Sequence, residues 1–220
     1  YTSSQISPLL TILIVIPISF IGNLLIYNLL LAPLVRRSKS TGALEVDSIL
    51  ATFGMSFILI GIMTSIEGGF FAYKYLSEPI QILGSTTSLS RLVAFLIATL
   101  IALVLYLWLN KTRSGVAVRA VSVSTEAAGL VGINVPRISA FAFAIGGAIT
   151  AVGGALISTF ITLDASIGVV FTLKALIIVI MGGVGEIRGA IIAAIILGIV
   201  ETTVATLVDP GLTLAAAYFI

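Results

Sequence analysis

Apolar residues fill this chain in runs that are too long and too continuous for the core of a soluble protein. Of its 220 residues, 59% are hydrophobic and only 9% are charged, whereas soluble domains carry about 25% charged residues. A helix of about 20 apolar residues crosses the hydrocarbon core of a bilayer, which is about 30 Å thick. The chain is therefore predicted to be an all-α protein, a polytopic bundle of transmembrane helices that passes several times through the cell membrane and is surrounded by lipid.

Five apolar segments have about the length of a membrane span, and a sixth segment is clearly shorter. The five spans are predicted at residues 9–31, 49–66, 92–109, 138–163 and 190–207. The short segment, residues 169–181, reaches only about 20 Å at about 1.5 Å per residue, which predicts a short or broken helix. It leads into a glycine-rich link, whose backbone must be buried in protein or line a cavity if it lies at membrane depth. The glycines of this link are Gly182, Gly183, Gly185 and Gly189.

The basic residues gather in two loops that are separated by two predicted spans, so both loops lie on the same side of the membrane. The first loop contains Arg36, Arg37 and Lys39, and the second lies within residues 110–137. Because an excess of Lys and Arg marks the cytoplasmic side, both loops are predicted to be cytoplasmic. The loops at residues 67–90 and 164–172 are then predicted to lie on the opposite side.

The second basic loop is predicted to contain a short helix outside the membrane. Ser124 or Thr125 is a suitable N-cap, Glu126 places a negative charge in the first turn, and Gly132 is a suitable end. Two interpretations of this helix stay open at this point. It is either a capped connector between two spans or a docking surface for a soluble partner.

Three charged residues lie in or beside the spans, namely Glu67, Lys174 and Glu201. A charge that faces lipid is energetically expensive, so these side chains are expected to face protein, water or an interface. Each is a candidate for the translocation pathway. Glu67 and Lys174 lie near segment ends, and a position at the membrane interface, with the charged group extended toward water, is an equal alternative for these two.

Small residues recur every fourth position on two of the predicted spans. This small-xxx-small pattern lets helix backbones approach closely in lipid, and it predicts helix packing, with a substrate path as the less favoured alternative. The rows are Gly146, Thr150, Gly154 and Ser158; Gly147, Ala151, Ala155 and Thr159; and Ala190, Ala194, Gly198 and Thr202.

Several classes of function find no support in the composition. The chain has no Cys and no His, which excludes thiolate or imidazole metal sites, Cys nucleophiles and disulfides. It has no Gly-x-x-x-x-Gly-Lys-Ser/Thr phosphate loop, so it does not bind ATP by that device. No nucleophile and base pair stands at a plausible catalytic depth. The chain is therefore expected to be a non-catalytic subunit without a cofactor or metal of its own, and nucleic-acid binding gets no support.

Motifs in the second half of the chain point further. The cytoplasmic loop carries Glu126, Ala127, Ala128, Gly129 and Gly132, and later segments read Phe-Thr-Leu-Lys-Ala at residues 171–175 and Gly-Gly-Val-Gly from residue 182. With these motifs, residues 113–201 resemble the LivH- and LivM-like permease subunits of ABC importers for branched-chain amino acids. Weaker matches extend the resemblance over nearly the whole chain. In that family, a loop with a Glu-Ala-Ala-like start and a following Gly forms the coupling helix that sits in a groove of the ATPase.

The resemblance implies a function and a set of partners. The chain is expected to be one transmembrane permease domain, residues 1–220, that translocates branched-chain amino acids. It is expected to lack a segment at each end, because the opening helix of the family is absent and the apolar run at residues 212–220 is too short to span a bilayer. Its expected partners are ABC ATPase subunits, which use the ATP, a second permease subunit in a homodimer or heterodimer, and an extracytoplasmic solute-binding protein. The alternatives are a permease for another small polar solute (sugar, nucleoside, urea or amide) and a secondary transporter or channel.

Overall fold

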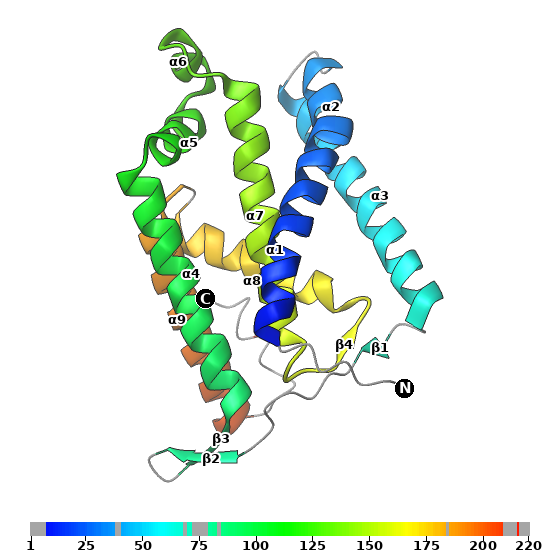
Figure 1. Ribbon diagram of the computed structural model, residues 1–220, viewed down its shortest axis with the longest axis vertical. Helices are drawn as coiled ribbons and strands as arrows, with labels where there is room; N and C mark the ends of the chain where they lie inside the picture. Colours follow the sequence, from blue (N-terminus) through cyan, green and yellow to red (C-terminus); the bar gives the residue numbers. More distant parts are fainter. Residues whose placement is uncertain are drawn as a thin grey trace.

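The structure is a computed structural model that describes residues 8–37, 41–67, 70–71, 79–82, 85–183, 185–208 and 215. Long helices run along the length of the molecule, and the shorter helix α8 crosses between them (Figure 1). The long helices are α1 (Pro8–Ile26), α3 (Thr41–Glu67), α4 (Leu89–Lys111), α7 (Val135–Ile157) and α9 (Ile187–Leu207). The shorter helices are η1 (Tyr27–Leu31), α2 (Ala32–Arg37), α5 (Arg113–Val123), α6 (Thr125–Leu130) and α8 (Ile167–Gly182).

Five helical segments of the described chain are long and apolar enough to cross a membrane. They are Thr11–Val35, Val46–Ser65, Leu89–Lys111, Val135–Ile157 and Ile187–Leu207. Their positions agree with the five predicted spans, except that the fourth helix ends at Ile157 rather than near residue 163, and the predicted bundle of transmembrane helices is confirmed. α8 has 16 residues and is shorter than these spans, which confirms the short helix that was predicted before the glycine-rich link.

The first span differs from its prediction because the helix does not end near residue 31. α1 continues through the π-helical segment η1 into α2, and the N–H of Ala32 donates to the carbonyl oxygen of Tyr27, five residues earlier. Proline lacks a backbone N–H and disturbs a regular α-helix. The π-helical turn ends at Leu31, two residues before Pro33, and shifts the hydrogen-bond register there; the helix then continues to Arg37.

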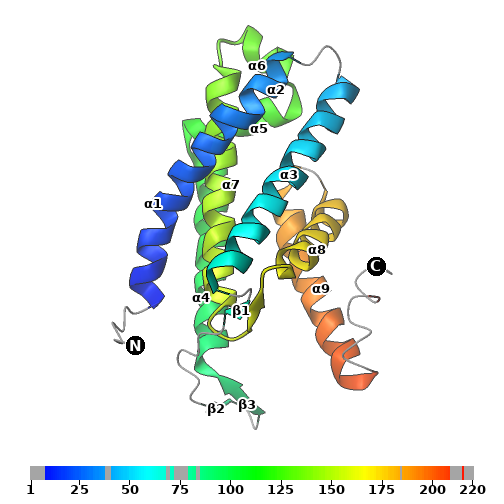
Figure 2. The same cartoon turned by 90° about the vertical axis from the view of Figure 1, so that its right-hand side faces the viewer.

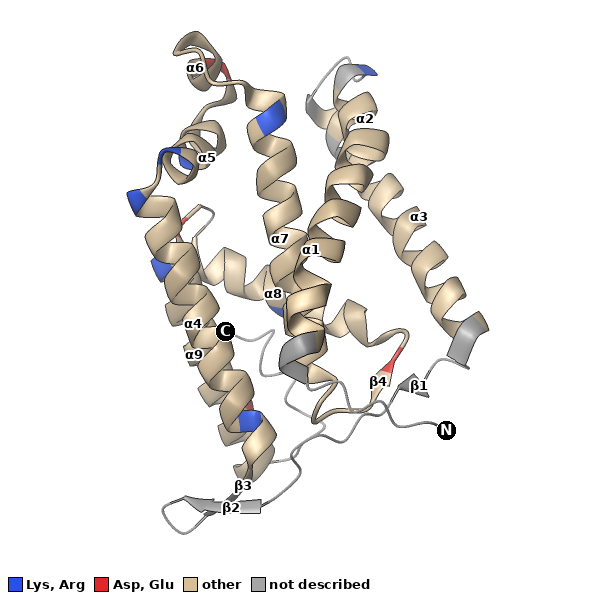
Figure 3. Cartoon of the chain, in the orientation of Figure 1, with Lys and Arg blue, Asp and Glu red and all other residues tan. Residues whose placement is uncertain are grey.

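The two ends of the bundle differ in charge and in structure. Figure 3 shows basic residues on and beside α2, α5 and α6 at one end of the molecule. The opposite end carries two short antiparallel strand pairs, which were not predicted. β1 (Phe70–Phe71) pairs with β4 (Leu163–Asp164), and β2 (Pro79–Ile82) pairs with β3 (Ser85–Ser88). By the positive-inside rule, the end with α2, α5 and α6 is predicted to be the cytoplasmic one. Lys39 lies outside the described residues.

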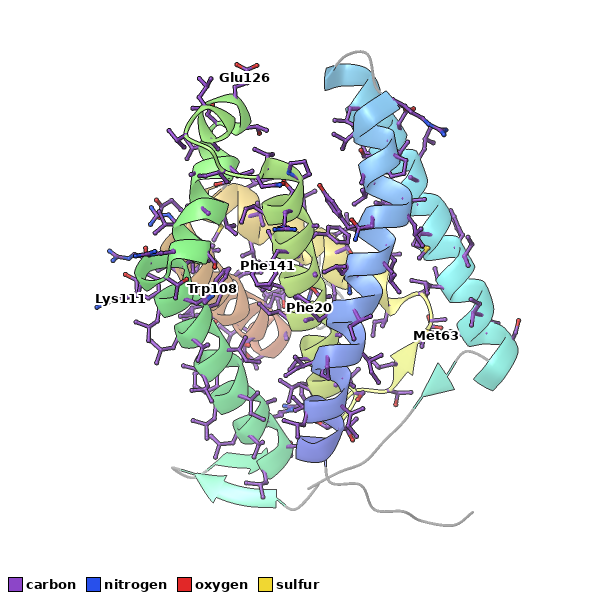
Figure 4. The ribbon with its side chains drawn as sticks, turned by 45° about the horizontal axis from the view of Figure 1, so that its top comes forward. Phe20, Met63, Trp108, Lys111, Glu126 and Phe141 are labelled. Atoms are coloured by element: carbon purple, nitrogen blue, oxygen red, sulfur yellow. The ribbon has the colours of Figure 1, made fainter. Side chains whose placement is uncertain are left out.

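α1, α4 and α7 group together on one side of the molecule, while α8 and α9 lie on the other (Figure 2). One face of α7 forms the centre of the first group. Its buried residues recur every fourth position and are Ala140, Ala144, Ala148, Val152 and Leu156. Figure 4 shows aromatic side chains of α1, α4 and α7 that converge there. The ring centroids of Phe20 and Phe141 are 5.8 Å apart, and those of Trp108 and Phe141 are 5.9 Å apart.

The contact of α1 with α7 uses a small residue, as predicted. That residue belongs to the row that begins at Gly147, not to the row that begins at Gly146. Gly147 faces α1, and a Cβ atom at this position would overlap the side chain of Asn23. Ser19 donates a hydrogen bond of 3.1 Å to the carbonyl oxygen of Gly147. Gly146 and Gly154 of the other row are exposed, with no atom of the described residues placed to meet a Cβ. Within this chain, therefore, only one of the two neighbouring rows on α7 packs against α1.

α5 was not predicted as a helix. The side chain of Thr112 caps its start by accepting a hydrogen bond from the N–H of Gly115. Gly115 is buried against the end of α4, where a Cβ would lie 2.5 Å from the Cα of Leu109. This glycine therefore allows α5 to fold back closely on α4. The helix was missed because the segment is polar, whereas the predicted spans were identified by their apolar runs.

Candidate functional site

Two of the three predicted pathway residues form an ion pair between α8 and α9. Lys174 Nζ donates a hydrogen bond of 2.9 Å to Glu201 Oε2 and lies 2.8 Å from Glu201 Oε1. The side chains are 24% and 21% exposed, so both are largely covered but remain accessible. Glu201 is fourteen residues beyond Ile187, or about 21 Å along α9 at about 1.5 Å per residue, which places it inside the span. The structure thus pairs two charges that would each be expensive alone at this depth.

The glycine-rich link brings α8 and α9 together. A Cβ on Gly182 would lie 2.5 Å from the backbone nitrogen of Ala190, and a Cβ on Gly189 would overlap the carbonyl oxygen of Gly182. Gly183 and Gly185 have φ angles of +88° and +87°, which side chains other than glycine rarely adopt. Each of the four predicted link glycines therefore has a physical reason. Two permit close backbone contact, and two permit the turn between the helices.

The carboxylate of Glu201 lies on the same face of α9 as its buried residues. Ala193 and Leu197 are both 3% exposed, and Glu201 continues their four-residue spacing. Residues spaced by four lie on the same face of a helix. Lys174 reaches this face from α8 and also lies 6.0 Å from the ring centroid of Phe171. The ion pair is therefore an extension of the apolar α9 face.

Glu67 is the third predicted pathway residue. It is the last residue of α3, at the end of the molecule that carries the strands, and its side chain lies outside the described residues. The structure therefore brings together two of the three predicted pathway residues, Lys174 and Glu201.

The predicted cytoplasmic helix is present as α6, with caps at both ends. Ser124 Oγ accepts a hydrogen bond of 3.2 Å from the N–H of Ala127 at its start. At its end, the N–H of Gly132 donates to the carbonyl oxygen of Gly129, and the N–H of Ile133 donates to that of Ala128, both at 3.1 Å. This is the Schellman pattern, and Gly132 has the positive φ of +82° that the pattern requires. Ser124, rather than Thr125, is the cap.

The five residues predicted for coupling divide between the two sides of this loop. Ala128 is only 3% exposed and packs inward, which differs from its expected place on a docking surface. The other four, Glu126, Ala127, Gly129 and Gly132, are exposed. Figure 4 shows Glu126 at the tip of α6, pointing away from the bundle. α6 therefore presents one face outward while Ala128 anchors it.

A contact and a cavity near the cytoplasmic ends of α4 and α9 were not predicted. Arg188 Nε donates a hydrogen bond of 2.9 Å to the hydroxyl of Tyr106, and the guanidinium carbon lies 5.1 Å from the centre of that ring. Both residues line a cavity of about 500 Å³ together with Arg119. Tyr106 falls inside an apolar run, and nothing in the sequence pattern indicates that it faces a residue 82 positions later.

Comparisons with known proteins agree on one family. A family model described as "Branched-chain amino acid transport system / permease component" matches residues 2–219. The high-affinity branched-chain amino acid transport system permease protein LivH of Salmonella typhimurium is 33% identical over 175 residues, which cover 76% of this chain and 55% of that protein. The LivH protein of Escherichia coli is 31% identical over the same shares.

A more distant relative covers more of the chain. The probable branched-chain amino acid transport permease protein LivH of Methanocaldococcus jannaschii is 28% identical over 214 residues, or 90% of this chain and 64% of that protein. The chain thus spans between about half and two thirds of the length of these relatives. No solved structure matches it.

Proposed function

The chain belongs to the family of permease components of branched-chain amino acid transport systems, and on this premise we propose that it translocates branched-chain amino acids as a permease subunit of an ABC importer. Separate ATPase subunits use the ATP, and this chain provides the path through the membrane. A second permease subunit, identical or different, completes the path, and an extracytoplasmic binding protein delivers the solute. The family membership and the multi-pass fold support this proposal.

The exposed face of α6 is the observation that carries the part of the proposal concerning ATPase subunits. Leu130 is 89% exposed and Val131 is 75% exposed, at the cytoplasmic end and outside the five spans. Val123, at the end of α5, is 87% exposed. Apolar side chains gathered on a surface in water point to a protein partner. The partner that we propose for this surface is an ATPase subunit, with a groove that receives α6.

The connections of α6 suit a coupling element. α6 lies between α5, which packs on the end of α4, and α7, which forms the centre of the α1–α4–α7 group. Because α6 contacts α5 and α7 and its Ala128 is buried, a displacement of α6 by closing ATPases acts on α4, through α5, and on α7. ATP hydrolysis changes the pore only if docking differs in free energy between the two pore states.

The Lys174–Glu201 pair is the part of the chain that we assign to the translocation path. Its side chains are partly accessible. Glu201 is charged in a span whose buried residues, Ala193 and Leu197, are apolar, and Lys174 lies on the short helix α8. Intramembrane charges of this kind accompany substrate and ion pathways. The assignment covers these two residues alone among the described side chains.

Reconstitution tests the proposal. The chain is assembled in vesicles with its ATPases and binding protein, and ATPase stimulation is measured with leucine, isoleucine, valine, a sugar, a nucleoside and urea. The proposal expects stimulation and uptake with the branched-chain amino acids. Stimulation by another solute instead would reassign the substrate, and uptake that needs no ATPase would indicate a secondary transporter or channel.

The coupling helix has its own test in the same vesicles. Glu126→Lys and Gly132→Trp are expected to leave the membrane part folded in detergent but to remove ATPase binding or ATP-driven uptake. Thr99→Ala on the exposed face of α4 is the control, because among the described residues its hydroxyl donates only to the carbonyl oxygen of Phe95 in its own helix. Normal assembly and normal uptake by both α6 variants would show that α6 is a connector.

A further inference from the structure

The cavity between the end of α4 and the start of α9 gathers two positive charges from distant parts of the chain. Arg119 of α5 and Arg188 of α9 both line this cavity of about 500 Å³. Arg119 Nη1 donates a hydrogen bond of 2.8 Å to Oδ1 of Asn110. Arg188 Nε donates one of 2.9 Å to the hydroxyl of Tyr106, which lies one turn before Asn110. One face of α4 therefore holds both guanidinium groups by neutral acceptors.

The two positive charges are not neutralised within the described residues. Neither guanidinium group forms an ion pair there, although the carboxylate of Glu186 also lines the cavity. Two guanidinium groups and one carboxylate leave the lining with a net positive charge. Ile187 and Arg188 begin α9 and line the cavity as well, so the partial positive charge of the helix N-terminus adds to it. The cavity therefore suits an anion with several acceptor oxygens, which can accept hydrogen bonds from both guanidinium groups.

This cavity lies where two spans reach the boundary of the membrane. The span Leu89–Lys111 ends there and the span Ile187–Leu207 begins there. Trp108, in the last turn of α4, belongs to a residue type that is enriched at this boundary. Basic pockets between transmembrane helices at this depth bind the head groups of anionic lipids. The position of the cavity thus favours a lipid phosphate as the anion.

An apolar groove lies deeper between the same two helices. It has a volume of about 580 Å³ and is lined by Phe95 of α4 and by residues of α9 that include Ile195 and Ile199. Ile195 is seven residues beyond Arg188, or about 10 Å along α9 at about 1.5 Å per residue. Seven residues are close to two full turns, so both residues lie on one face of α9. Ile195 and Ile199 are 55% and 61% exposed, so an apolar chain can reach them.

On α4, the groove and the cavity also share a face. Tyr106 lines the cavity and Phe95 lines the groove. They are eleven residues apart, which is close to three full turns of an α-helix. The groove therefore lies in line with the cavity along both helices, with the charged end at the membrane boundary and the apolar part inside the membrane.

From these observations we infer that the α4–α9 pair binds an anionic glycerophospholipid. Arg119 and Arg188 bind the phosphate of the head group, and one acyl chain lies in the groove between α4 and α9. The cavity provides charge complementarity for the head group, and the groove provides apolar contact that a soluble phosphate compound does not use. The inference goes beyond the proposed function, because it does not depend on the solute that the chain transports.

Lipid binding to the purified transporter complex, delipidated in detergent, tests the inference. Native mass spectrometry counts the bound lipids while dimyristoyl phosphatidylglycerol or dimyristoyl phosphatidylcholine is titrated. Both lipids have a phosphate and the same chains, but the choline group adds a positive charge that would lie beside the two guanidinium groups. Phosphatidylglycerol is therefore expected to bind about tenfold more tightly. Equal binding of the two lipids, or no binding of phosphatidylglycerol, overturns the inference.

Soluble phosphates separate a lipid site from a site for a free anion. Inorganic phosphate and glycerol 3-phosphate have the phosphate group but no acyl chain for the groove. They are therefore expected to displace phosphatidylglycerol only at concentrations on the order of a hundredfold higher than that of the lipid, or not at all. Displacement by either compound at the concentration of the lipid itself would show that the cavity takes a soluble anion, and the inference would be wrong.

Two double variants with the same change in charge test the cavity. Arg119→Gln/Arg188→Gln is expected to bind phosphatidylglycerol at least about tenfold more weakly than the unmodified complex. Lys111→Gln/Arg113→Gln is the matched control, because these two side chains are exposed at the end of α4 and the start of α5 but do not line the cavity. Its binding is expected to change by less than about threefold. Equal losses in both double variants would indicate only a general attraction of the basic surface for anionic lipid, which overturns the inference.

A further variant tests the groove. Gly198 lines the groove and is open at its Cβ, so a leucine there fills the groove without meeting another atom of the described residues at its Cβ. Gly198→Leu is expected to weaken the binding of phosphatidylglycerol about threefold or more. Gly54→Leu on α3, equally open at its Cβ, is the control and is expected to bind as the unmodified complex does. Unchanged binding by Gly198→Leu contradicts the inference. If a variant does not assemble, the comparison of the two lipids on the unmodified complex still decides the question.

Discussion

α1–α7 and α8–α9 are two helix pairs that approach closely at glycine, but different interactions hold them together. At α1–α7, the contact combines Gly147, a hydrogen bond from Ser19 and aromatic rings, and all of these groups are neutral. At α8–α9, the backbones meet at Gly182 and Gly189, and an ion pair connects the helices farther along. The difference shows that this chain packs helices without charges where packing is the requirement.

The charges at α8–α9 therefore need another reason. Replacing a buried ion pair by apolar groups of similar volume often leaves stability unchanged or raises it, whereas removal of one partner is costly. The glycine contact already holds the two helices together at one end. We therefore propose that the ion pair is retained for transport, whereas the neutral contact of α1 with α7 serves the fold.

The largest effect is expected at the backbone contact of the glycine-rich link. Gly189→Leu places a side chain against the backbone of Gly182, which cannot move aside, so a loss of about 3 kcal/mol or more is expected. Thermal unfolding followed by size-exclusion chromatography measures it. Gly198→Leu on the same helix has open space at its Cβ and is the control. Equal stability of the two variants would mean that α8 and α9 do not meet at this link.

The next effect concerns the ion pair itself. Glu201→Ala leaves Lys174 without its partner, and a loss of about 1–3 kcal/mol is expected, below the cost at a fully buried site because the side chains are partly accessible. Lys174→Met combined with Glu201→Leu is expected to recover most of this loss. A thermal unfolding series of the single and double variants measures the coupling. Additive losses in the double variant would show that the two residues do not interact.

A smaller effect is expected where α1 meets α7. Gly147→Leu drives a side chain into Asn23, which is flexible and can move in part, so a loss of about 2 kcal/mol is expected. Gly146→Leu, one residue earlier and open at its Cβ, is expected to be tolerated in the isolated subunit. The thermal stability of the purified subunit separates the two. If Gly146→Leu were the less stable variant, the row that contains Gly146, and not the row that contains Gly147, would face α1.

The smallest effect is expected for the hydrogen bond between these helices. Ser19→Ala removes the bond to Gly147, and interhelical hydrogen bonds in membranes contribute about 0.6 kcal/mol on average. Ser56→Ala on α3 removes a bond within one helix and is the matched control. Chemical denaturation in mixed micelles resolves a difference of this size. A loss of several kcal/mol in Ser19→Ala would indicate that polar contacts dominate this pair.

Much of this architecture was predictable because lipid imposes simple rules on the chain. The five spans and the short α8 follow from apolar length, while the sidedness, which follows from the distribution of basic residues, stays a prediction. The capped α6 was predictable because its caps are local in sequence, within a few residues of Ser124 and Gly132. Local rules thus gave the spans, α8, α6 and their order, but not α5 or the two strand pairs.

Contacts between distant elements were not predictable from the sequence pattern. Both small-residue rows on α7 have the same spacing, and only the position of α1 decides that Gly147, not Gly146, is covered. Lys174 and Glu201 were each candidates for the pathway, but their pairing depends on the α8–α9 turn. Tyr106 and Arg188 meet for a similar reason, since their contact depends on how α9 lies beside α4.

The central claim is that the Lys174–Glu201 pair serves transport rather than folding, and one measurement addresses it most directly. ATP-driven leucine uptake is measured in vesicles that contain the double variant Lys174→Met/Glu201→Leu with the ATPases and binding protein, beside the thermal stability of the same preparation. The account predicts stability close to that of the unmodified transporter and loss of uptake, while Ser19→Ala retains uptake. Uptake at the unmodified level by the double variant would contradict the claim.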